Sequence, residues 1–155
     1  MTLKDRLAVV DALLARPFPE KAEREVPSRD VWDGYRSSGP DSHLCCLAAG
    51  HDFWDDRGEE IVEAAQEEID AALQELVTAL TTRWGDPGVI DLWPYWESEG
   101  TAPAPLDELC QLSGTMLVWW PPDAGRWVAL TVGQADPEFP ILLLAAVGET
   151  PRGKG

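Results

Sequence analysis

The sequence is poor in the residues and motifs on which most catalysis depends. Its 155 residues include three lysines, three cysteines and two histidines, His43 and His51. No pair of cysteines or of histidines stands at the separation typical of a zinc site. A glycine-rich phosphate loop and a G-x-S-x-G frame are both absent, and Ser113-Gly114 is the nearest approach to the latter. The sequence therefore predicts no catalytic residue and no cofactor.

The cysteines do not indicate a disulfide-stabilised or redox-active protein. Cys45 and Cys46 are adjacent within an apolar segment, and adjacent cysteines make a poor bridge. Cys110 has no partner at a recognisable spacing. We expect all three to be small, reduced core residues, and whether Cys46 and Cys110 lie close together stays open.

Long hydrophobic segments are missing too. The apolar run at 140–147 is too short to span a bilayer, which needs ~20 residues. The N-terminus leads into an amphipathic segment and lacks the apolar core of a signal peptide. These two features predict a soluble protein of the cytoplasm.

Positive charge is scarce as well. Twenty-eight acidic residues against 12 basic ones give a net charge of −16. Such a chain repels the phosphates of nucleic acids and the anionic surface of membranes, so neither is an expected partner. A basic protein is the partner that this field attracts, and the alternative is that the charge serves solubility alone.

Apolar residues recur at helical spacing in two segments, 3–15 and 59–84. In the second segment they fall on one side and carboxylates on the other, which makes it the clearest element of the sequence. An aspartate before it, Asp55 or Asp56, is expected to cap this helix. The Gly-Asp-Pro-Gly sequence that follows is expected to end it.

Five segments have sequences typical of strands: 42–49, 89–93, 115–120, 126–132 and 141–147. The five-residue loop at 121–125 is expected to join the third and fourth as a hairpin. The last strand is apolar throughout and is expected at the centre of the sheet. The segment 20–40, which is rich in proline and glycine, is expected to be irregular.

Strands that follow one another favour antiparallel pairing in an α+β layer. We therefore predict an antiparallel sheet of about five strands, with the long helix packed across one face and an N-terminal helix. A chain of this length fits one domain. Its expected parts are an N-terminal helix and irregular arm at 1–40, an α+β core at 41–149 and a frayed tail at 150–155.

The eight tryptophans divide into core and surface candidates. Strand alternation sends Trp119 and Trp120 to opposite faces of the sheet, so that one of them packs under the long helix. Three tryptophans are expected to pack in the core: Trp84, Trp120 and Trp127. Trp54 and Trp96 lie in polar, acidic segments, where an aromatic anchor among carboxylates would suit lysine or arginine side chains.

Carboxylates around these two anchors give two candidate partner-binding surfaces. The first contains Asp52, Trp54, Asp55, Asp56, Glu59, Glu60 and Glu63, with Glu67 one turn further. The second contains Asp91, Trp96, Glu97 and Glu99. A run of carboxylates is most often a solvated helix face, and it becomes functional when it steers a cationic partner. Because the spacing around His51 and Asp52 does not fit an EF-hand loop, no metal site is predicted.

Three segments carry a resemblance to a known class of proteins. They are Arg83-Trp84-Gly85-Asp86-Pro87, Leu92-Trp93-Pro94-Tyr95 and Gly125-Arg126-Trp127-Val128-Ala129-Leu130-Thr131-Val132-Gly133-Gln134. In layout and turn residues, the C-terminal two thirds of the chain resembles small acidic immunity-type proteins of bacterial polymorphic toxin systems. The resemblance implies a cytoplasmic antidote that binds the catalytic domain of a toxin and blocks it. Many such toxins act on nucleic acids or nucleotides and so carry basic active-site surfaces.

We therefore expect a non-enzymatic, immunity-type protein that neutralises a basic toxin domain by occluding its active surface. Two alternatives stay open. One is a small hydrolase or ligand-binding enzyme, which would show a deep pocket with tryptophans and a buried carboxylate. The other is a homo-oligomeric structural or adaptor subunit, which would show a large apolar patch on the sheet face opposite the long helix.

Overall fold

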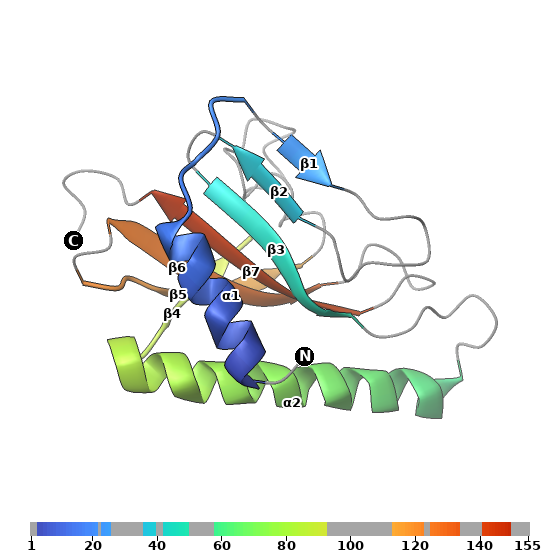
Figure 1. Cartoon of the computed structure of the whole chain (residues 1–155). Coiled ribbons are helices and arrows are strands. Elements are labelled where there is room, and N and C mark those ends of the chain that lie inside the picture. Colours follow the sequence, from blue (N-terminus) through green and yellow to red (C-terminus); the bar gives the residue numbers. More distant parts are fainter. Residues whose placement is uncertain are drawn as a thin grey trace.

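The structure is a computed structural model that describes residues 3–21, 23–25, 36–39, 42–49, 58–92, 113–122, 125–133 and 141–149. Its elements in chain order are α1 (Leu3–Ala15), β1 (Glu23–Glu25), β2 (Arg36–Gly39), β3 (Ser42–Ala49), α2 (Glu59–Trp84), β4 (Gly88–Asp91), β5 (Thr115–Trp119), β6 (Arg126–Gly133) and β7 (Leu142–Glu149). Both helices pack on one side of an antiparallel sheet (Figure 1). The predicted α+β fold, with a long helix across one face and an N-terminal helix, is confirmed.

The sheet consists of two meanders joined by α2. The first meander is β1-β2-β3 and the second is β4-β5-β6-β7. The last strands of the two meanders, β3 and β7, pair with each other and give the order β1-β2-β3-β7-β6-β5-β4. In the chain, α2 comes between the two meanders, and in space it crosses one side of the sheet (Figure 1). The strand β7 is therefore central, as its apolar sequence predicts, and β4 forms an edge.

The sheet has seven strands where the sequence predicts about five, because β1 and β2 lie in a segment that was expected to be irregular. Their sequences, Glu-Arg-Glu and Arg-Ser-Ser-Gly, contain no β-branched or aromatic residue. They form by pairing: β2 runs antiparallel to β3, with Gly39 opposite Ser42, and β1 is added to β2. The boundaries of the five predicted strands agree with the structure to within two residues.

The long helix forms where apolar residues recur every three or four positions. Five of its residues are buried: Ala65, Ile69, Ala72, Leu76 and Leu80. Its N-cap residue is Gly58, without a side-chain cap hydrogen bond, and the predicted cap residues Asp55 and Asp56 lie outside the described residues. It ends at Gly85, which has a φ of 88° and donates its N–H to the Thr81 carbonyl. Neither described helix combines the length and the apolar character that a membrane span needs.

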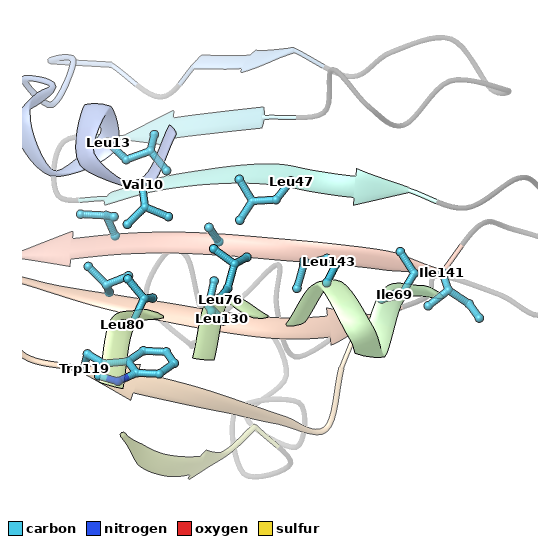
Figure 2. Close-up of a cluster of buried hydrophobic side chains, with 14 of the residues drawn as sticks. Val10, Leu13, Leu47, Ile69, Leu76, Leu80, Trp119, Leu130, Ile141 and Leu143 are labelled. Carbon is cyan, nitrogen blue, oxygen red and sulfur yellow. The ribbon is translucent and has the colours of Figure 1, made fainter. Parts of the chain in front are cut away.

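The helices and the sheet enclose the larger of two hydrophobic clusters (Figure 2). It contains side chains that are no more than 1% exposed: Val10 of α1, Leu76 and Leu80 of α2, and Leu130 and Leu143 of the sheet. Complete burial of one such side chain stabilises the fold by ~1.5–3 kcal/mol. This cluster therefore holds α2 firmly against the sheet and fixes which of its residues face solvent.

The opposite face of the sheet is apolar as well. Leu44, Val118 and Leu144 alternate with the helix-facing residues and are no more than 2% exposed. No helix of the described ranges contributes to this second cluster. Burial on both faces explains why the central strands have nearly continuous apolar sequences.

Candidate functional site

The solvent side of α2 carries a concentration of carboxylates. The acidic face is defined here as the seven exposed acidic residues of this helix: Glu59, Glu60, Glu63, Glu67, Glu68, Asp70 and Glu75. At 1.5 Å per residue it extends for ~24 Å along the helix. The only basic residue of α2 is Arg83, near the other end. Because the buried residues fix the rotation of the helix, the acidic face points away from the sheet.

Three of the ten predicted partner-binding residues lie on the acidic face: Glu59, Glu60 and Glu63. The helix brings them together, because positions three and four apart are neighbours on its surface. The other seven lie outside the described residues: Asp52, Trp54, Asp55, Asp56, Trp96, Glu97 and Glu99. Glu68, Asp70 and Glu75 were not predicted as binding residues, although the same helical spacing that predicts the buried side also places them on the exposed one.

Among the described residues, little positive charge offsets the acidic face. Arg83 pairs instead with Asp11 of α1, with 2.9 Å between Nη1 and Oδ1. Both side chains of this pair are substantially exposed, so it stabilises the fold by only ~0.2–1 kcal/mol. Asp70 accepts a hydrogen bond from Nε2 of Gln66 at 2.9 Å, and this neutral donor leaves its negative charge in place. The acidic face is therefore a strongly negative surface on a rigid support.

A second exposed surface lies at the β4 edge of the sheet. Val89 of β4 is 70% exposed and Trp120, directly after β5, is 47% exposed. The outer ring of Trp120 reaches over Gly88, where an added Cβ would lie 3.1 Å from Cη2 and 3.2 Å from Cζ3. The absence of a side chain at Gly88 thus allows the indole to extend across the edge strand.

The predicted separation of Trp119 and Trp120 is confirmed, since Trp119 is 1% exposed in the helix-side cluster while Trp120 is exposed. The predicted core position of Trp120 is wrong, because β5 ends before it and its ring reaches the sheet edge. Trp84 and Trp127 are partly buried against the first and second clusters, in agreement with their predicted packing. Trp127 lies over Gly148 of β7, where a Cβ would overlap the indole.

His43 is a neutral structural residue beside the end of α1. It is 1% exposed, with Nδ1 2.7 Å from Oγ of Ser38 and Nε2 3.1 Å from the carbonyl oxygen of Arg16. Since a carbonyl only accepts, Nε2 carries the proton and Nδ1 accepts from the Ser38 hydroxyl. Burial is the main cause that lowers the pKa of His43 below 6.5. The hydrogen bond to Arg16 opposes this, and the positive charges of Arg16 and Arg126 add to it.

Arg126 of β6 holds the same end of α1. Its Nη1 donates to the carbonyl oxygens of Leu13 at 2.8 Å and of Arg16 at 2.7 Å. These carbonyls lie at the C-terminus of α1, where a helix lacks internal donors. The guanidinium also lies 4.0 Å from the ring centroid of Phe18, which is 4.8 Å from that of His43. This group therefore anchors α1 to the sheet.

Other side chains that could carry chemistry are engaged in structural contacts. Oγ of Ser113 lies 2.8 Å from Oγ1 of Thr131 and 3.0 Å from the carbonyl oxygen of Thr115. The thiols of Cys45 and Cys46 donate to backbone carbonyls at 3.5 and 3.3 Å. In the part of the chain that the structure describes, no three or more His, Cys, Asp or Glu side chains are grouped to hold a metal ion.

The described surface thus offers a partner two features: negative charge on the acidic face and apolar contact area at the β4 edge. Both are means of binding, and neither brings a nucleophile together with a base. Comparisons with protein-family models, with curated proteins and with solved structures found no match to this chain, so these physical features carry the interpretation.

Proposed function

We propose that this chain is an immunity-type binding protein, which captures a basic protein such as a toxin catalytic domain and blocks its active surface. The observation that carries the proposal is the charge of the acidic face. Seven carboxylates and one arginine give α2 a charge of −6, out of −16 for the whole chain. Charge concentrated in this way attracts and orients a cationic partner before contact, which raises association rates by tenfold to about a thousandfold at low salt.

The packing of α2 against the sheet, which holds the acidic face in place, favours binding too. Ile69 and Leu76, on the reverse side of α2, are 4% and 0% exposed. The backbone that carries the carboxylates is therefore already ordered, and only side chains lose freedom when a partner binds. The proposal includes a cytoplasmic location, which the sequence predicts.

The test of the proposal is capture of the partner from the host. Tagged protein is incubated with host lysate at low salt, and bound proteins are eluted with ~1 M salt, at which the Debye length falls from ~10 Å to ~3 Å. We expect one basic protein in stoichiometric amount, with a toxicity that co-expression of this chain suppresses. Recovery of no basic protein, or of one whose activity the chain leaves intact, would refute the proposal.

A matched pair of variants then locates the binding surface. Glu63→Lys reverses a charge on the acidic face, and Glu20→Lys reverses an exposed charge outside α2. Each raises the net charge by two, from −16 to −14. At low salt, Glu63→Lys should lower the association rate with the captured partner about two- to tenfold more than Glu20→Lys does. Equal effects would mean that overall charge, and not the acidic face, attracts the partner.

A further inference from the structure

Within the described residues β4 is an edge strand, and Val89 presents backbone hydrogen-bonding groups at this edge. This strand is the last in the sheet order, paired with β5. Leu92 donates its N–H to the carbonyl oxygen of Gly114, 2.7 Å away, in the register that continues from β4. Antiparallel pairs alternate between bonded and non-bonded positions, so Gly88 and Ile90 direct their groups toward β5. Val89, between them, directs its N–H and C=O away from β5, within the plane of the sheet and past its edge.

The side chains of this edge suit an added strand. Val89 is 70% exposed and lies opposite Leu117, which packs against the helix-side cluster. The exposed ring of Trp120 reaches over Gly88 on the other face. Protein edges are commonly protected by lysine, proline, a bulge or an inward-pointing charge. The sequence Gly-Val-Ile-Asp of β4 contains no lysine or proline, and its register with β5 is regular.

Charge decides which strand fits this edge. A second copy of the chain would bring together two molecules that each carry −16, which disfavours self-association. The exposed carboxylate of Asp86 lies two residues before Gly88. The face of an indole attracts ammonium and guanidinium groups. A strand that alternates apolar and basic residues meets all of these conditions, with the apolar residue beside Val89 and the basic one beside Trp120.

We propose that the β4 edge binds an extended segment of the basic partner as an added antiparallel strand, through the backbone of Val89 and the indole of Trp120. The inference rests on the proposed function for the charge of the partner. It adds a second surface and a mode of binding that the acidic face does not supply, since backbone hydrogen bonds give such a contact its affinity and side-chain alternation gives its specificity.

The probe is a seven-residue peptide of alternating lysine and valine, acetylated and amidated at its ends and fluorescently labelled. Val89 and the residue opposite it exchange both backbone bonds if valine lies beside Val89. N-methylation of two valines should therefore abolish binding, whereas N-methylation of two lysines, whose N–H groups point to solvent, should leave it. Anisotropy at ~0.15 M salt measures the affinity, and the amide resonance of Val89 should shift as the peptide binds.

Three variants test the residues. Val89→Pro removes the outward N–H and leaves the β4–β5 bonds, and should weaken binding about tenfold, the equivalent of one hydrogen bond. Val89→Thr keeps the N–H and is its control, with affinity expected within about threefold of the original. Trp120→Ala should weaken binding about two- to fivefold through loss of the cation–π contact. Thermal unfolding of each variant verifies that it is folded.

The outcomes separate this inference from the proposed function. Equal binding of the two N-methylated peptides, or full affinity of Val89→Pro, would overturn the β4 site. A dimer of the free chain that Val89→Pro dissociates would also overturn it, because the occupant would then be a second copy. Failure of partner capture with intact peptide binding would refute the proposed function alone.

Discussion

Glu63 stands in the most repulsive part of the acidic face, and its replacement by lysine should raise stability. Residues three and four positions apart on a helix are neighbours, with Cβ atoms ~5–6 Å apart. Those of Glu63 include Glu59, Glu60 and Glu67. Each like-charge pair costs ~0.2–0.5 kcal/mol and each opposite pair gains a similar amount. Reversal of three pairs therefore gives ~1–3 kcal/mol, and exposure to solvent places the expected value near the lower limit.

Glu75→Lys is the matched control for this substitution. It makes the same chemical change on the same exposed side of α2 and alters the net charge equally. The residues three and four positions from Glu75 are alanines and a threonine, so no pair of charges is affected. The difference in stability between the two variants therefore isolates the repulsion around Glu63.

Thermal unfolding followed by circular dichroism measures this difference. For a domain of this size, 1 kcal/mol corresponds to a shift of ~2–4 °C in the midpoint. We expect Glu63→Lys to unfold ~2–6 °C above Glu75→Lys at low salt. Most of the difference should disappear near 1 M salt, where the Debye length is ~3 Å. Equal midpoints at low salt, or a difference that salt leaves unchanged, would refute the argument that these carboxylates repel one another.

Two further predictions concern the interior. Gly148→Ala should destabilise the fold by ~1–3 kcal/mol in chemical denaturation, because its Cβ would overlap the indole of Trp127. Gly39→Ala, with nothing within 4 Å of the new Cβ, should change stability by less than ~1 kcal/mol, and equal losses would contradict this reasoning. Stability should also fall on acidification, because the pKa of His43 is below 6.5 in the folded state and ~6.5 when unfolded, so the unfolded chain takes up the proton first. This loss of stability begins as the pH falls through ~6.5 and is complete below the folded pKa. His43→Gln should remove this contribution from the profile of stability against pH. Parallel profiles of the two proteins would show that His43 is not the source of the loss.

Periodicity predicted the elements whose burial is set by their own residues. The helix at 59–84 and the strand at 42–49 were predicted with the boundaries that the structure shows, because the helix repeats its apolar residues over its whole length and the strand is a short, continuous apolar run. The strands β1 and β2 were not predicted, since their stability comes from the ladder of β3 and not from their own side chains. The sequences of β1 and β2 alone do not indicate that they pair with β3 and with each other.

For the candidate surfaces as well, local spacing predicted some residues, and the position of others depended on the arrangement of the strands. Helical spacing was sufficient to place Glu59, Glu60 and Glu63 together on an exposed face. The position of Trp120 could not be obtained in this way, because alternation gives the face of the sheet but not the distance of a residue from its edge. That distance depends on the strand order, in which β5 lies next to the edge strand β4. The Pro-Pro sequence directly after Trp120 was the local sign that the strand ends there.

Stability alone does not account for the acidic face. Glu59 and Glu60 lie in the first turn of α2, where carboxylates complement the helix dipole. This benefit falls off beyond the first turn, so the other five carboxylates gain little from it. Solubility requires net charge, but a surface of mixed charge provides it without repulsion between neighbours such as Glu63 and Glu67. A cationic partner would remove that repulsion, so the stability that Glu63→Lys gains in the free protein should disappear in the complex.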